Sequence, residues 1–250
     1  MLLQYRAAAL AGIGTQIFWG LIRVMIFEAF YRSTTAPQPM KLEDVITYVW
    51  LGQALLALLP WNSDQEIRGM IRSGTVAYEL LRPVDLFNLW YSRSVATRTA
   101  PTLLRSIPIF VLAMLYFGMR FPPSAASGGA WALATLGAIV LGCAISTLIN
   151  ISLMWTISGE GVSRLIPAMV MIFSGMLIPL PLFPNWAQSI LAFLPFAGLV
   201  DTPFRLYMGE IPPSHVFMVL AHQLGWTLAL IAIGRFVLSR GIRVLVVQGG

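Results

Sequence analysis

The sequence is poor in charge. Only 10% of its 250 residues are charged and 58% are hydrophobic, whereas a soluble domain carries about 25% charged residues. So few charges cannot cover a surface that faces water, so a membrane is the expected solvent for most of the chain. A net charge of +6 would indicate nucleic-acid binding in a soluble protein. Here arginine-rich loops on one side of a membrane explain it, and we expect no nucleic-acid partner.

Lysine, cysteine and histidine are also scarce, which excludes several kinds of chemistry. The only lysine is Lys41, in "QPMKLED", and no glycine-rich loop precedes it as a P-loop requires. Cys143 is the only cysteine, so the chain has no intramolecular disulfide and no cysteine-based metal cluster. No acidic residue accompanies His215 and His222 on their predicted helix, so a metal site is not expected there. We therefore predict no catalytic residue, cofactor or metal in this chain, which is not itself an enzyme.

Long apolar runs make up most of the sequence. A helix needs roughly 20 apolar residues to cross the hydrocarbon core, and helices are expected because the backbone must satisfy its own hydrogen bonds in lipid. The sequence thus predicts an all-α membrane protein, a single transmembrane domain over residues 1–250. Its six predicted transmembrane helices cover residues 7–30, 45–60, 102–121, 131–153, 165–183 and 216–238. The first run has no clear cleavage site and is long enough to span, so it is predicted to be a retained helix.

The arginines indicate how the chain is oriented. An even number of spans puts both termini on one side, and cytoplasmic loops carry an excess of Lys and Arg. With the termini inside, nine arginines lie in inner segments: Arg6, Arg68, Arg72, Arg82, Arg93, Arg98, Arg164, Arg240 and Arg243. Only Arg32, Lys41 and Arg205 lie in outer segments. We therefore expect both termini to be cytoplasmic.

The longest predicted inner segment covers residues 61–101. Apolar residues recur at helical spacing in "EIRGMIRSGTVAYELL", and Arg68 and Arg72 lie on the opposite side. This pattern is typical of amphipathic helix at a membrane surface, with Gly74 at a joint. Pro83 disfavours helix at Arg82, and Asp85 is placed to cap a new helix that leads into the third span.

The outer segment after the fifth predicted span is divided by prolines. Pro184 and Pro195 enclose the apolar piece Trp186–Leu194, which is too short to cross a bilayer. Residues 184–203 are therefore predicted to form an outer re-entrant or interfacial hairpin.

A few polar residues lie within the predicted spans, where they are functional candidates. Arg23 has Gln16 seven residues before it on the same face, and it faces a cavity, reaches the outer surface or pairs with Glu28. Asn150 ends a row of small residues spaced every fourth position, which favours helix packing over a lining role. With Ser174 in the fifth span, Gln16, Arg23 and Asn150 are the candidates for a substrate path.

Two motifs resemble those of a known family. The stretch "IRSGTVAYELLRPVDLFNLW" (Ile71–Trp90) is similar to an R-x-G … L-L-R-P signature of one bacterial branch, and "FSGMLIPLPLFPNWAQSILAFLPF" (Phe173–Phe196) to an S-G-x-x-x-P … P-x-W … L-P-F run. The chain resembles the permease subunit of a bacterial ABC exporter with the type II exporter fold, the ABC-2 type permeases.

The resemblance implies how such a chain would work. The permease would dock onto separate ABC ATPase subunits that hold ATP and Mg, would pair with an identical or sister permease, and would lie in the bacterial inner membrane. The segment between spans two and three would couple ATP hydrolysis to transport. Its candidate coupling residues are Glu66, Arg68, Arg72, Gly74, Arg82, Pro83 and Asp85.

Three alternatives stay open at the level of sequence. The arginines of the coupling segment can instead bind anionic lipid heads. The chain can be a membrane scaffold or assembly factor that recruits a cytoplasmic partner without transport. A secondary transporter is less favoured, because no internal repeat is evident. The apolar composition of the spans suits a lipid-like cargo and equally suits packing against lipid.

Overall fold

The computed structural model describes residues 2–61, 63–155 and 160–244, and all regular structure in these ranges is helical. The α-helices are α1 (Leu2–Ser33), α2 (Leu42–Ala54), α3 (Gln65–Ser73), α4 (Val76–Leu80), α5 (Leu86–Tyr116), α6 (Ala125–Ser152), α7 (Glu160–Phe173), α8 (Asn185–Phe193), α9 (Asp201–Met208) and α10 (Val216–Gly241). Short 3-10 helices are η1 (Leu56–Leu58), η2 (Leu180–Leu182), η3 (Ala197–Leu199), η4 (Pro213–His215) and η5 (Ile242–Val244).

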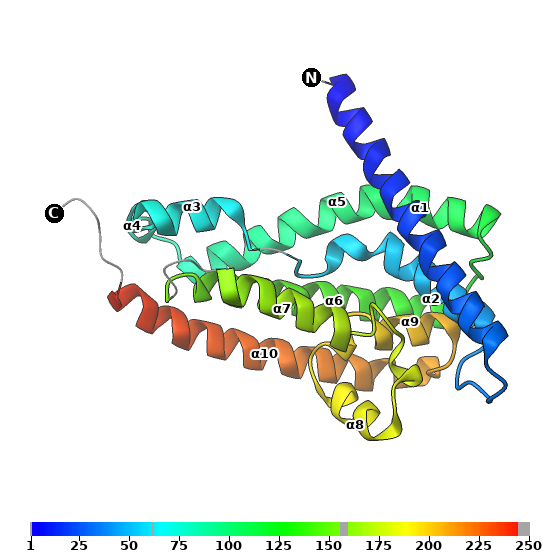
Figure 1. The fold of residues 1–250 in the computed structure, drawn as a ribbon. Coiled ribbons are helices and arrows are strands. Elements are labelled where there is room, and N and C mark those ends of the chain that lie inside the picture. The colour runs from blue at the N-terminus through cyan, green and yellow to red at the C-terminus, as the bar shows by residue number, and fades with distance from the viewer. Residues whose placement is uncertain (1, 62, 156–159, 245–250) are drawn as a thin grey trace.

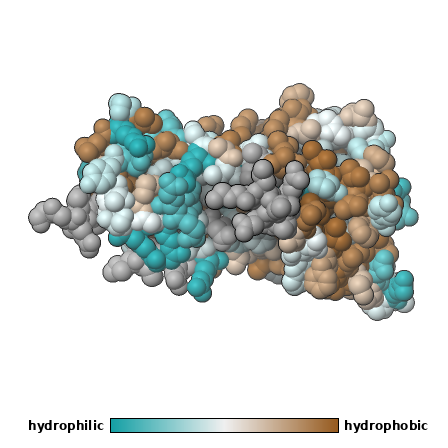
Figure 2. All heavy atoms as spheres, turned by 90° about the horizontal axis from the view of Figure 1, so that it is seen from above, coloured by the Kyte–Doolittle hydropathy of each residue, from teal (hydrophilic) through white to brown (hydrophobic). Residues whose placement is uncertain are grey.

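The long helices form an elongated bundle with two distinct ends. Helices α5, α6, α7 and α10 run along its length, while α1 leans across it (Figure 1). Helices α3 and α4 lie at one end, with the C-terminal end of α10, and α8 and α9 lie towards the other (Figure 1). We call these the α3–α4 end and the α8–α9 end. Polar residues gather towards the α3–α4 end and apolar residues cover most of the remaining surface in Figure 2.

Four helices of the described chain are long and apolar enough to cross a membrane: Leu10–Ser33, Leu86–Tyr116, Ala125–Ser152 and Pro213–Gly241. The predicted second and fifth spans instead overlap α2, with 13 residues, and α7, with 14. At 1.5 Å per residue each is about 20 Å long, short of a core about 30 Å thick. The structure therefore supports four span-length helices, and the six-span topology stays a prediction.

One helix joins the end of the predicted inner loop to the third predicted span. The helix predicted to start after Asp85 and the predicted span 102–121 form the single helix α5, which ends at Tyr116, so much of the expected inner loop 61–101 is the first half of α5. The expected helix start after Asp85 is confirmed, because the Asp85 carboxylate accepts a hydrogen bond from the Asn88 N–H at 2.8 Å. Within 184–203 the apolar piece is the helix α8, which Pro184 precedes.

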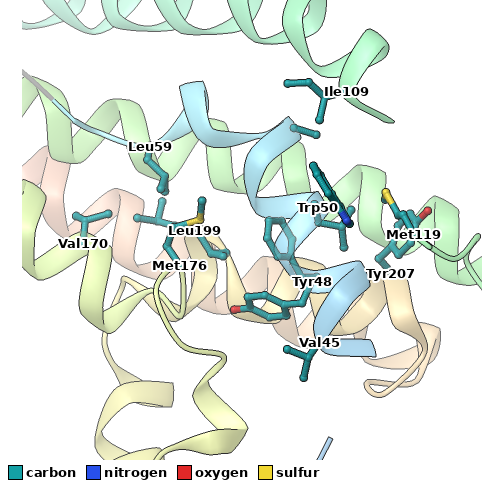
Figure 3. Packing of buried hydrophobic residues seen from close by; sticks show 14 of the residues in the cluster. Val45, Tyr48, Trp50, Leu59, Ile109, Met119, Val170, Met176, Leu199 and Tyr207 are labelled. Carbon is teal, nitrogen blue, oxygen red and sulfur yellow. The ribbon is translucent and has the colours of Figure 1, made fainter. Parts of the chain in front are cut away.

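The short helix α2 lies inside the main core. Val45, Tyr48 and Trp50 are almost fully buried, and around them side chains converge from α5, α7, η3 and α9 (Figure 3). The Trp50 ring stacks on Phe117 with centroids 4.8 Å apart, and its N–H donates to the Phe117 carbonyl at 3.1 Å. Burial on all sides thus stabilises a helix that is too short to face lipid along a full span.

Candidate functional site

The segment at the α3–α4 end begins with a capped helix. The Asp64 carboxylate accepts hydrogen bonds from the N–H groups of Glu66 at 2.9 Å and Ile67 at 3.3 Å, which satisfies donors that the first turn leaves free. The helix α3 ends at Gly74, whose φ of 74° is the left-handed conformation that glycine adopts without strain. The joint expected at Gly74 is therefore confirmed.

Two long helices hold this segment in place. Arg93 of α5 donates to the Asp64 carboxylate at 2.6 Å and also to Glu66. Asn150 of α6 accepts a hydrogen bond from the Asp64 backbone N–H at 2.9 Å. Burial raises the pKa of Asp64, but hydrogen bonds from Arg93 and from the backbone outweigh it, so this pKa lies below its ordinary value. The carboxylate is therefore held ionised at the start of α3.

The segment has a buried face and an exposed face. Ile67 and Val76 are fully buried against a cluster that includes Trp90 of α5 and Leu238 of α10. Tyr78 and Leu81 are 70% and 81% exposed. The inner face thus ties α3 and α4 to the bundle, while the outer face presents apolar side chains where a partner or a lipid surface can bind.

The turn that follows α4 carries the last three predicted coupling residues. Arg82 pairs with Glu79 at 3.3 Å, and Pro83 lies between the helices α4 and α5. Asp85 lies 3.6 Å from Arg235 of α10. Of the other candidates, Arg68 is partly exposed and Arg72 exposed on α3. All seven candidate residues are therefore gathered in one segment, and Glu66 and Asp85 also tie it to α5 and α10.

A second feature is a cavity of about 830 Å³ along α1. Its walls come from α1, the end of α2, η1, and the turn between α7 and η2, and they include Gln16, Trp19, Arg23, Gln53, Met176 and Leu182. Volumes of roughly 300–1,000 Å³ are typical of small-molecule sites. Most of the walls are apolar, which suits a hydrophobic ligand.

Arg23 lies in the wall of this cavity and binds the backbone of another helix end. Its guanidinium donates to the carbonyls of Met176 and, at 3.1 Å, of Leu177. These carbonyls lie in the turn after α7, which ends at Phe173, and the guanidinium supplies donors to backbone oxygens there. The pairing with Glu28 that the sequence left open is not the observed contact, because Glu28 lies 3.9 Å from Arg32.

The four substrate-path candidates fall into two groups. Gln16 and Arg23 line the cavity. Ser174 is fully buried, and its hydroxyl accepts a hydrogen bond from the Met176 N–H at 3.3 Å. Asn150 anchors the α3–α4 segment. The last two therefore act as structural contacts in this conformation.

Two polar residues in or beside the bundle were not singled out by sequence. Gln53 lines the cavity and is 3% exposed; an amide inside the apolar run 45–60 was the available signal. Arg98 of α5 donates to the carbonyls of Leu58, at 3.3 Å, and Leu59 at the end of η1. The sequence counted Arg98 only among the arginines of the inner loop, and the structure alone shows that it reaches the carbonyls of η1.

Within the described ranges no group of three or more His, Cys, Asp or Glu side chains is arranged to hold a metal ion. The family model described as "ABC-2 family transporter protein" matches residues 17–249. Comparisons with curated proteins and with solved structures gave no match. The family match covers the α3–α4 segment and the walls of the cavity apart from Thr15 and Gln16, and it confirms the resemblance that the two motifs indicated. The chain belongs to the ABC-2 transporter family and is an ABC-2 type permease.

Proposed function

We propose that this chain is the membrane-spanning permease of an ATP-driven ABC exporter. A second permease, identical or sister, pairs with it to form the substrate path, and separate ABC ATPase subunits bind ATP with Mg and supply the energy. Membership of the ABC-2 family supports this assignment, as does the absence of a P-loop sequence from the chain.

The observation that carries the proposal is the way the α3–α4 segment is mounted. Its inner face is fixed by Arg93, by Asn150 and by buried Ile67, so a push on the segment is passed to α5 and α6. Its outer face exposes Tyr78 and Leu81. A coupling element between an ATPase and a bundle requires firm attachment to the bundle and an exposed apolar surface that the ATPase can contact.

The proposal includes six membrane crossings and a sidedness. The α2–η1 segment and α7 with its following turn cross together with the four long helices, and buried neighbours replace lipid contact along part of each. The α3–α4 end faces the cytoplasm of a bacterial cell, because it carries Arg72, Arg82, Arg240 and Arg243. Both termini then lie on that side of the inner membrane.

Charge reversal in the coupling segment tests the assignment. The double variant Arg72→Glu/Arg82→Glu is expected to lose the ATPase subunit on co-purification, or to abolish substrate-stimulated ATP hydrolysis, because the docking face changes sign. The matched control is Arg240→Glu/Arg243→Glu, which makes the same charge change at the same end on α10 and η5. The control is expected to keep the ATPase.

Unchanged assembly with the ATPase and unchanged ATP hydrolysis in the Arg72→Glu/Arg82→Glu variant would contradict the coupling assignment. A complex that keeps its ATPase and moves no substrate in vesicles would instead favour the scaffold alternative. The two outcomes are separate readouts of the same preparation.

A further inference from the structure

Two buried amides in the wall of the cavity have an unpaired atom. Gln16 is 8% exposed and Gln53 is 3% exposed. The side-chain oxygen Oε1 of each is buried and has no hydrogen-bond partner within the described chain. Buried polar groups are nearly always hydrogen-bonded, and each exception costs free energy. Both side chains line one cavity, and an amide oxygen accepts hydrogen bonds, so a ligand there that offers a hydrogen-bond donor fits these oxygens once the amides turn towards it.

The same cavity also holds positive charge without a matching carboxylate. Within the described chain the contacts of Arg23 are the carbonyls of Met176 and Leu177, and no acidic side chain forms an ion pair with it. Carbonyl dipoles offset only part of a full charge, and a partly buried cation such as Arg23 favours a nearby anion. The polar end of a ligand that binds in this cavity is therefore expected to be anionic.

The other walls fit a hydrophobic tail. Trp19, Ile26 and Phe30 on α1 are 54%, 60% and 46% exposed and also line the cavity, so the cavity is bordered by the apolar surface of a predicted span. Gly20 lets α1 approach α2, because a Cβ there would lie 2.6 Å from Trp50 and 3.2 Å from Gln53. This close approach places Gln53 beside the polar residues of α1.

We infer that this cavity binds an amphiphile with an alkyl tail and an anionic head, whose charged oxygens lie at Arg23 and whose hydroxyl, as in a phosphate monoester, donates to Gln16 and Gln53. A molecule of this class reaches the site laterally from the membrane. Its role as cargo rests on the function proposed above, whereas its binding does not.

Quenching of tryptophan fluorescence tests the site, since Trp19 and Trp61 line it. The full-length permease is placed in phosphatidylcholine nanodiscs without the ATPase. It is titrated with 12-bromododecyl phosphate and, in a separate experiment, with 12-bromododecyl trimethylammonium. Saturable quenching by the phosphate is expected, with affinity at least about tenfold above that of the ammonium compound, because a charge-assisted contact is gained. Equal affinity for both compounds would overturn the inference.

Variants separate binding from folding. Arg23→Met is expected to weaken phosphate binding about tenfold or more. The control Arg32→Met, on the same helix with an 81% exposed side chain, is expected to bind like the wild type. Gln53→Leu removes an unpaired buried polar atom, so it is expected to weaken binding and raise the Tm of the ligand-free protein. Wild-type affinity in Arg23→Met and Gln53→Leu would contradict the site.

The two natural sources of such a ligand are distinguished by further readouts. An anionic lipid retained by the purified wild type and lost from Arg23→Met, seen by native mass spectrometry, identifies a membrane lipid. Stimulation of ATP hydrolysis in the reconstituted complex by dodecyl phosphate identifies cargo. Either result supports the site, and the quenching assay stays decisive if the ATPase assignment fails.

Discussion

Two arginines within long helices donate to backbone carbonyls at or beyond the ends of short helices on their neighbours. Arg23 of α1 donates to carbonyls in the turn after α7, and Arg98 of α5 donates to the carbonyls of Leu58, the last residue of η1, and Leu59. Where a helix stops short inside a bundle, its last carbonyls need donors, and lipid supplies none. These arginines therefore satisfy backbone carbonyls at the end of η1 and in the turn that follows α7. Sequence alone placed Arg23 in a span but did not show what it binds.

At the residue scale we predict that acid weakens the contacts of Asp64 that hold the start of α3 in place. The pKa of Asp64 is lower in the folded protein than its ordinary value. The ionised Asp64 carboxylate therefore stabilises the folded protein fully above an unfolded-state pKa of about 3.9. This stabilisation is lost as the pH falls through the lower folded-state pKa. A bimane label at Tyr78→Cys is expected to report loosening of the segment in that acid range.

The Asp64→Asn variant is the control for this prediction. Asparagine keeps an oxygen that can cap α3 but does not titrate, so its segment is expected to be looser at neutral pH and to lack the acid step. An identical acid transition in wild type and Asp64→Asn would assign the step to another group.

At the scale of elements, close contact with α1 decides how α2 is placed. Gly20 lies against Trp50, which is fully buried and stacked on Phe117. The helix α2 has no room to move away, because its other sides pack against α5 and α9. The packing of α1 on α2, and with it the cavity between them, depends on a residue without a side chain.

We therefore predict that Gly20→Val separates α1 from α2. Overpacking of this kind costs about 1–3 kcal/mol, which is expected as a lowered Tm in detergent. The control is Gly14→Val on the same helix, where an added Cβ meets no other atom within 4 Å. Equal Tm values for the two variants would show that the contact at Gly20 is not tight.

At the scale of the whole molecule, the two ends differ in surface chemistry. The α3–α4 end is polar and carries the anchored segment, whereas apolar residues cover most of the remaining surface on the face that Figure 2 shows. Near the other end Trp186 and Phe193 of α8 are 74% and 70% exposed. Exposed aromatic side chains next to a polar boundary are typical of a membrane interface. This asymmetry supports a fixed orientation of the bundle.

Single cysteines test that orientation. A membrane-impermeant maleimide added to intact spheroplasts is expected to label Trp186→Cys, and to label Tyr78→Cys only after permeabilisation. The native Cys143 is buried, so the wild type serves as the unlabelled control. The reverse labelling pattern would invert the orientation, and labelling of both sites from outside would contradict the six-crossing topology.

The sequence alone determined that the chain lies in a membrane, that it is helical, that the α3–α4 segment has a joint at Gly74 and is followed by a cap at Asp85, and which family it belongs to. These follow from composition, periodicity and local backbone preferences, which act over a few residues. The tertiary structure decided where α2 and α7 end, that α5 runs from Leu86 through the predicted third span as one helix, and that Asn150 anchors Asp64. It also brought Gln53 beside Gln16 and Arg23. Such contacts join residues far apart in the chain, and only the packing of one helix against another decides them.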